Sequence, residues 1–233
     1  MEHDLTKTIT ACGLILFLCT AVWLGGHDGY IAAMSTDVDP VRTIIIDAGH
    51  GGFDGGAVGV GGLVEKEINL SVAQKLESML AFLGYDTVMT RDEDEALGKE
   101  GESIHGRKVS DIKYRLSLLE SAPDALLISV HQNFFGGKAE GAQIFYGPIN
   151  PESRSLAEML QNGFKCLLQP ENDRAAKPAG SNIYLLYHAT RPAVMVECGF
   201  ISNREEAAKL SEMEYQKKLC FVMASGLAEY MAE

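Results

Sequence analysis

Three side chains that can bind a metal or move a proton each lie at the end of a short apolar run. His50 comes three residues after the run TIIID, His131 directly follows the run ALLISV, and Glu197 is the last residue of the run AVMVE. Continuous apolar runs of this length are typical of buried strands in a parallel sheet. Because ligands bind beyond the carboxyl ends of the strands in open α/β sheets, we expect all three side chains at one edge of the sheet.

A fourth candidate, Glu65, opens an amphipathic segment that begins Glu65-Lys66-Glu67. At about 100° per residue, the apolar residues of this helix fall within roughly 60° of Glu65, and Glu67 lies about 200° away. Those apolar residues are Ile68, Val72, Leu76, Met79 and Leu83. Glu65 therefore lies in the buried stripe, while Glu67 lies on the outer face. The helix dipole alone would also favour an acid in the first turn, so the position on the stripe is what indicates a ligand.

These residue types match a known kind of metal site. Two histidines and one carboxylate form a catalytic zinc set that leaves a fourth position for water, so His50, Glu65 and His131 predict Zn2+ as cofactor. Glu197 is then free to act as general base toward the attacking water. Either histidine alone would be more typical of a hydrogen-bonded structural group. Cys198 could suggest a thiol nucleophile, although a cysteine beside an apolar strand is more often inert.

The elements that must position these residues alternate along the chain. Strands are predicted at residues 43–47, 86–90, 125–130, 143–146, 183–186 and 193–197, and helices at 65–83, 109–120, 152–168, 204–210 and 214–230. Apolar strands separated by helices predict an α/β fold. We expect a single domain with a mostly parallel, twisted sheet of about six strands and helices on both faces.

Eight glycines lie between Gly49 and Gly62. No GK[ST] follows them and no G-x-G-x-x-G falls among them, which argues against a phosphate-binding loop. We interpret the glycines as residues that let the backbone turn tightly around His50.

Charge and cysteine content exclude several classes of protein. The 233 residues carry 20 Lys and Arg against 32 Asp and Glu, a net charge of -12. Nucleic-acid binding needs a basic face, and none is visible. Five cysteines without CxxC spacing do not indicate a disulfide framework or a cysteine-rich zinc site.

An apolar segment at residues 9–24 precedes the folded part. Its 16 uncharged residues are short for a helix that spans a bilayer, which takes about 20. We predict that residues 1–33 are a signal or membrane anchor, either cleaved near Ala32-Ala33 or retained, that 34–40 are a linker and that 41–233 are the catalytic domain. Export from the cytoplasm follows, with membrane attachment if the segment is retained. The alternative is that the segment is a buried helix of the domain.

Several blocks of the sequence occur in a specific combination and order. They are IIIDAGHGGFDGGAVG, LVEKEINL, VMTRDED, SVHQN, GAQIFY and AVMVECGFISN. In these blocks the chain resembles the zinc-dependent N-acetylmuramoyl-L-alanine amidases of bacterial cell walls, from about Arg42 to the C-terminus. In that family the positions matching His50, Glu65 and His131 bind zinc, and the position matching Glu197 is the catalytic glutamate.

The resemblance implies a reaction and its partners. The reaction is hydrolysis of the amide between the lactyl group of N-acetylmuramic acid and the L-alanine of the peptidoglycan stem peptide. Within the family, the chain is most similar to the spore-cortex members. The similarity is in the segment NIYLLYHATRPAVMVECGF and in the lack of wall-binding repeats. This implies a location in the cell-wall or spore-cortex space and a role in muramic-δ-lactam formation. Peptidoglycan would be the substrate, with a downstream muramic acid deacetylase and a protein activator as partners.

Three polar residues are candidates for holding the substrate. Arg91, after the second predicted strand, and Arg174 could bind substrate carboxylates, because a guanidinium matches a carboxylate well. A surface salt bridge is the alternative for both. Asn133, in the SVHQN segment, is the third candidate.

Two other functions use the same residues. The first is a different zinc hydrolase, such as a carboxypeptidase or a deacetylase. The second is a wall-binding or partner-binding protein with a vestigial zinc site, against which the presence of all four chemical residues argues.

Overall fold

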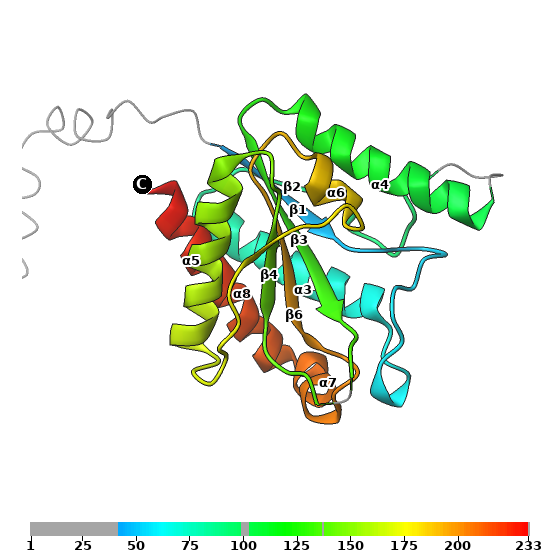
Figure 1. Ribbon diagram of the computed structural model, residues 1–233, viewed down its shortest axis with the longest axis vertical. Helices are drawn as coiled ribbons and strands as arrows, with labels where there is room; N and C mark the ends of the chain where they lie inside the picture. Colours follow the sequence, from blue (N-terminus) through cyan, green and yellow to red (C-terminus); the bar gives the residue numbers. More distant parts are fainter. Residues whose placement is uncertain (1–41, 99–102, 137, 233) are drawn as a thin grey trace, which may run out of the picture. The chain divides into compact units, whose positions relative to one another are not determined.

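A six-stranded sheet in the order β2-β1-β3-β6-β4-β5 runs through the centre of the computed structural model, which describes residues 42–98, 103–136 and 138–232 (Figure 1). The strands are β1 (Thr43–Ala48), β2 (Thr87–Met89), β3 (Ala125–Asn133), β4 (Gln143–Tyr146), β5 (Lys177–Pro178) and β6 (Ala193–Phe200). The helices are α3 (Glu65–Phe82), α4 (Ile104–Ser121), α5 (Pro151–Leu167), α6 (Tyr184–His188), α7 (Arg204–Ser211) and α8 (Met213–Met231), with a short 3-10 helix η1 (Val60–Gly62).

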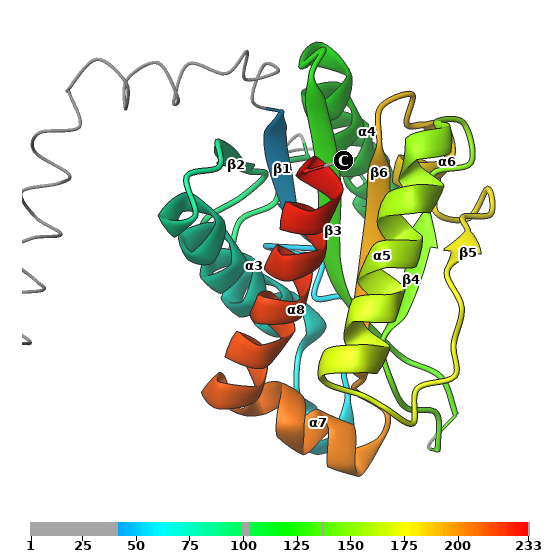
Figure 2. The same ribbon diagram turned by 90° about the vertical axis from the view of Figure 1, so that its left-hand side faces the viewer.

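Helices cover both faces of this sheet, as predicted. On one face, α3, α5 and α8 bury the even-numbered residues of β1, β3 and β6, and α8 packs between the other two helices (Figure 2). On the other face, α4 and α6 cover a smaller apolar cluster that includes Leu119, Leu127 and Leu185. The alternation of side chains along each strand produces the two clusters, because successive residues point to opposite faces.

The sheet is mixed. Four of its pairings are parallel, and β4 runs antiparallel to β6. The mostly parallel α/β fold predicted from the sequence is therefore confirmed, with one reversed pairing. As a result, β3 ends and β4 begins at the same edge of the sheet.

One predicted strand is wrong. Residues 183–186 belong largely to the short helix α6, and the sixth strand is instead β5, a two-residue edge strand. A four-residue apolar run cannot be assigned from periodicity alone, because a buried strand and a buried helical turn give the same pattern. The adjacent positions Leu185 and Leu186 are both buried, which fits a helical turn against the sheet.

All five predicted helices are found, with shifted ends. The largest shift is in α4, which begins five residues before the predicted start. Ser103 caps it by accepting a hydrogen bond from the Gly106 amide. Within the described part of the chain no helix is long and apolar enough to cross a membrane. The predicted leader and linker lie outside the described residues.

Candidate metal centre

The carboxyl edge of the sheet brings the predicted chemical residues together. His50 follows β1, and His131 and Glu197 face each other in the register of β3 and β6. Glu65 is the first residue of α3. Ligand atoms of His50, Glu65 and His131 all lie within 4.8 Å of one another. They are the one such group of three or more in the described residues.

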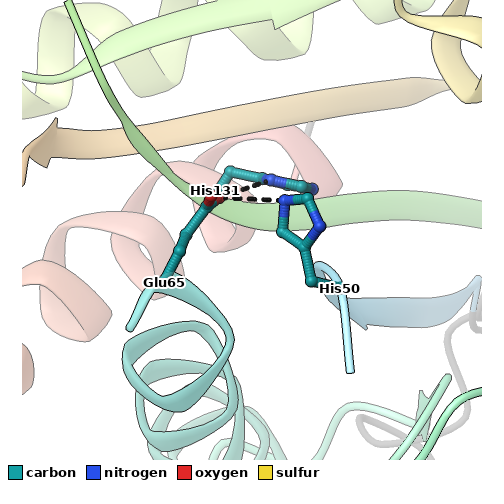
Figure 3. A group of neighbouring side chains, drawn as sticks. All are labelled: His50, Glu65 and His131. Carbon is teal, nitrogen blue, oxygen red and sulfur yellow. Dashed lines mark hydrogen bonds and ion pairs between the residues drawn. The ribbon is translucent and has the colours of Figure 1, made fainter. Parts of the chain in front are cut away.

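Both histidine rings converge on the Glu65 carboxylate (Figure 3). Glu65 Oε1 lies 3.0 Å from His131 Nδ1 and 3.3 Å from His50 Nε2. The two rings meet edge to face, with centroids 4.9 Å apart. Three donor atoms of the types that zinc prefers thus surround one point, and they come from three separate elements.

Helix phase accounts for the choice of acid. Glu65 is only 4% exposed, together with Ile68 and Val72 on the same stripe, whereas Glu67 is exposed. The burial predicted for Glu65 from periodicity is therefore confirmed, whereas the prediction is wrong for Leu83, which is 52% exposed just after the end of α3. Only Glu65 of this acidic pair can reach the histidines.

Neighbouring polar groups fix the orientation of the donors. Asp54 Oδ2 lies 3.0 Å from His50 Nδ1, so that nitrogen is engaged and Nε2 faces Glu65. Glu65 Oε2 accepts from the Ala57 amide at 2.8 Å, and Oε1 accepts from the Gln132 amide at 3.2 Å. Asn69 donates to Glu65 Oε1 at 3.4 Å. A carboxylate behind a ligand histidine is a recurring arrangement in metal sites.

Two glycines allow the close packing of the centre. A Cβ at Gly49 would come within 2.2 Å of the His131 ring. Gly56 has a φ of 68°, and a Cβ there would come within 2.5 Å of Glu65 Oε2 and 2.7 Å of the His50 ring. The glycine-rich segment therefore lets the backbone approach the donors, as the sequence predicted for His50.

The electrostatics of the cluster favour a bound cation. Burial lowers the pKa of His50, but hydrogen bonds and charges of Asp54 and Glu65 outweigh it and raise the pKa to about 9. Burial also acts to raise the pKa of Glu65, yet both histidines hold it well below its ordinary value. The carboxylates thus stabilise positive charge at this point. A metal ion could take the place of the proton on His50.

Glu197 differs from the three donors in its surroundings. Burial, opposed by His131 and His50 and reinforced by Glu65, raises the pKa of Glu197 to about 7. Its Oε2 is buried and has no hydrogen-bond partner among the described residues. An unpartnered carboxylate oxygen next to a metal-type donor set fits a group that meets a water or a substrate.

Cys198 does not supply a nucleophile. Its side chain is fully buried, and burial raises the pKa of the thiol well above its ordinary value. A neutral, enclosed thiol is unreactive. This placement supports the inert interpretation.

The three substrate-binding candidates lie in different surroundings. Arg91 is 2% exposed, and its guanidinium donates to backbone carbonyls, not toward the open edge. Arg174 is half-buried, stacks on Phe200 at 4.8 Å and donates to the Glu140 carbonyl. Both arginines therefore have partners inside the protein. The sequence had predicted either a contact with the substrate or a salt bridge at the surface. Asn133 is half-buried at the site end of β3, and its role remains a prediction.

Sequence reasoning missed several residues that support the centre. Asn69 lies one helical turn after Glu65, so the phase argument that selected Glu65 also points to it. Arg115 lies on the apolar stripe of α4 between Ile112 and Leu119, where a buried charge needs a partner. Asp54 had no signal beyond its place in the glycine-rich segment.

Comparisons with known proteins agree with this geometry. A family model described as N-acetylmuramoyl-L-alanine amidase matches residues 44–229. The germination-specific N-acetylmuramoyl-L-alanine amidase of Bacillus subtilis is 36% identical over 194 residues, which cover 82% of this chain and 81% of that protein. The N-acetylmuramoyl-L-alanine amidase LytC of the same organism is 31% identical over 212 residues, which cover 87% of this chain and 39% of LytC.

Solved structures show the same fold. The CwlD amidase from Clostridioides difficile, in complex with the GerS lipoprotein, superimposes with a TM-score of 0.78 at 33% identity. That match covers 82% of this chain and 98% of the CwlD chain. The amidase AmiC2 of Nostoc punctiforme gives a TM-score of 0.67 at 27% identity, covering 82% of this chain and 98% of that one.

Proposed function

Because the chain belongs to the N-acetylmuramoyl-L-alanine amidase family and is an amidase of peptidoglycan, we propose that His50, Glu65 and His131 bind the zinc ion on which its reaction depends. Glu197 is the proposed catalytic base. The amide that is broken joins the lactyl group of N-acetylmuramic acid to the L-alanine of the stem peptide.

One observation carries this proposal. Three donors of the zinc type lie within 4.8 Å of one another. The fourth residue, Glu197, lies opposite His131 in the β3–β6 pairing and has a buried oxygen without a hydrogen-bond partner among the described residues. A purely structural cluster would use all four polar groups to satisfy one another. Here one carboxylate oxygen is left over, as a reaction at this point requires.

The residues of the chain then have separate tasks. When bound, zinc would polarise the amide carbonyl and activate the attacking water. Glu197 Oε2, which has no hydrogen-bond partner among the described residues, accepts a proton from that water. The same carboxyl donates the proton to the L-alanine nitrogen as the amide breaks. Asp54 and Asn69 keep His50 and Glu65 oriented throughout.

The proposed setting is the cell wall of a spore-forming cell. The similarity to a germination-specific amidase and to CwlD supports a role in the spore cortex, where peptide removal would precede muramic-δ-lactam formation by a deacetylase. The CwlD structure contains the GerS lipoprotein, which supports a protein partner for this chain as well. An extracellular, wall-associated location follows from this role, with attachment to the membrane if the N-terminal segment is retained.

The test pairs metal content with product analysis for Glu197→Gln in the full chain. This change keeps the side-chain volume but removes the proton acceptor. We expect zinc content near that of the parent and a loss of peptide release of about 10²–10⁴-fold. Glu67→Gln, on the exposed face of α3, is the control that should keep both the zinc content and the peptide release. Loss of zinc together with activity, or activity near the parent's, would remove Glu197 from the role of base.

The products also separate this reaction from other zinc hydrolyses. Mass spectrometry of purified muropeptides, incubated with the protein and zinc, should show intact stem peptides with a free L-alanine amine. Release of a terminal amino acid would indicate a carboxypeptidase, and loss of an acetyl group would indicate a deacetylase. Zinc binding with no product at all would fit a vestigial site.

A further inference from the structure

Buried side chains hold the turn that carries His50. The carbonyl oxygens of Ala48, Gly49 and His50 each accept two side-chain hydrogen bonds. Arg91 contributes to all three, Arg115 contributes to the first and third at 3.0 and 2.8 Å, and Asn69 completes the second. Three consecutive carbonyl groups that each accept two hydrogen bonds from side chains fix this piece of backbone firmly.

The turn needs such support because of its conformation. His50 has a φ of 63°, in the left-handed region that a residue with a Cβ seldom adopts. Backbone of this kind persists only where its surroundings determine it. The direction of the His50 ring depends on this backbone, so the groups that hold the carbonyls also aim the ring at Glu65.

Arg91 and Arg115 differ in what they join. Arg115 is paired with Asp47 and Asp111, so it belongs to a buried ion-pair network beneath the turn. Arg91 has no carboxylate within ion-pair distance among the described residues. Its Nη2 instead donates to two carbonyls at 3.0 Å each, those of Gly49 and Lys66.

Those two carbonyls belong to the neighbours of two proposed ligands. Gly49 precedes His50, and Lys66 follows Glu65. A single nitrogen of Arg91 therefore connects the turn after β1 to the first turn of α3. In the described part of the structure Arg91 is 2% exposed, and its guanidinium makes five contacts with carbonyls. These contacts use four of its five N–H groups, because the one on Nε is shared between two carbonyls, and burial keeps the side chain away from solvent.

We propose that Arg91 is a positioning residue that sets the separation of His50 and Glu65 and thereby the zinc affinity of the centre. This inference rests on the proposed zinc site. It replaces the substrate-binding role predicted for Arg91 from the sequence. The planar fork of arginine is required, because one lysine ammonium could replace Nη2 at best. It would leave the carbonyls that Nε and Nη1 bind without those donors, so the His50 turn would be held less firmly.

The first test is Arg91→Lys in the full chain. We expect zinc affinity, measured by competition with a chromophoric chelator, to fall by about 10–100-fold, as when outer partners of metal ligands are lost. The absorption spectrum of the cobalt-substituted protein should change as well, because the ligand geometry shifts. Leu160→Ala, in the contact of α5 with α8, is the matched control, since it lowers the melting temperature without touching the centre. Zinc affinity in that control should equal the parent's.

A second variant covers the case in which Arg91→Lys folds poorly. Arg91→Ala leaves a space of guanidinium shape, so added guanidinium at millimolar concentration should restore zinc affinity, whereas equal ammonium should not. Parent-like zinc affinity in Arg91→Lys, or no rescue of Arg91→Ala, would overturn the proposal. A rise in KM alone with unchanged zinc binding would return Arg91 to the substrate. Failure of the parent protein to bind zinc would instead contradict the proposed function.

Discussion

Asp47 gives a prediction whose size can be worked out from its contacts. It is 1% exposed beneath the His50 turn, pairs with Arg115, and accepts hydrogen bonds from Ser129 and Thr90. Burial alone would raise the pKa of Asp47, but Arg115 and the two hydroxyl groups outweigh it and lower the pKa from 3.8 to about 2. At about 1.4 kcal/mol for each pH unit, this difference contributes about 2 kcal/mol to the free energy of unfolding.

The sign of the pH dependence follows from that direction. Because the pKa of Asp47 is lower in the folded protein, its ionisation stabilises the fold fully above about pH 5. The contribution declines as the pH falls below about 4 and is lost as the pH falls through about 2. Asp47→Asn resembles the protonated acid in shape, so the variant lacks this contribution at every pH.

Urea unfolding of the parent and Asp47→Asn at pH 6 and pH 3, both in EDTA, measures the effect. At pH 6 the variant should be less stable by about 2–5 kcal/mol, since removing one member of a buried pair leaves the other charge without its partner. At pH 3 the difference should be about 1 kcal/mol smaller, because much of the parent's Asp47 contribution is then gone. The exposed Asp124→Asn controls for the loss of one negative charge. An equal difference at both pH values would refute the assigned role of the Asp47 pair.

Three further outcomes are expected. Glu65→Gln should weaken zinc binding by at least tenfold while Glu67→Gln leaves it nearly unchanged, by chelator competition, and equal losses would mean that the wrong acid was assigned as ligand. Gly49→Ala should also lose zinc affinity, because its Cβ would meet the His131 ring, whereas Gly84→Ala, where a Cβ has open space, should lower stability alone. Added zinc should raise the melting temperature of the parent with increasing concentration, and no such rise should occur in the absence of the Glu65 carboxylate.

Much of the centre could be predicted because its residues obey two simple periodicities. Strand ends marked His50, His131 and Glu197, and helix phase separated Glu65 from Glu67. The same phase would have found Asn69 and Arg115, had it been applied to polar residues on every buried stripe. What the pattern could not give is three-dimensional pairing, such as Lys108 with Asp54 at 2.8 Å across 54 residues of sequence.

The sheet was predictable for a similar reason, and its exceptions are short. Long apolar runs identified β1, β3 and β6, because a strand buried on both faces is apolar throughout. The segment at residues 183–186 is too short to distinguish a helical turn from a strand. The direction of β4 was also hidden, because the side-chain pattern of a strand is the same whether its neighbour is parallel or antiparallel.

The reversed direction of β4 has a consequence for how such an enzyme could diversify. Because β3 ends and β4 begins at the edge of the sheet where His131 and Glu197 lie, the connection between the two strands starts and ends at that edge. Ser202 forms hydrogen bonds with the backbone of Phe135, and Glu206 accepts one from the Gly141 amide. The connection is therefore held at one end by the turn after β6 and at the other by α7. We expect insertions between these contacts to change the surface beside the proposed centre without moving His50, Glu65 or His131. This connection is therefore where we expect lineages to adjust which muropeptides they accept.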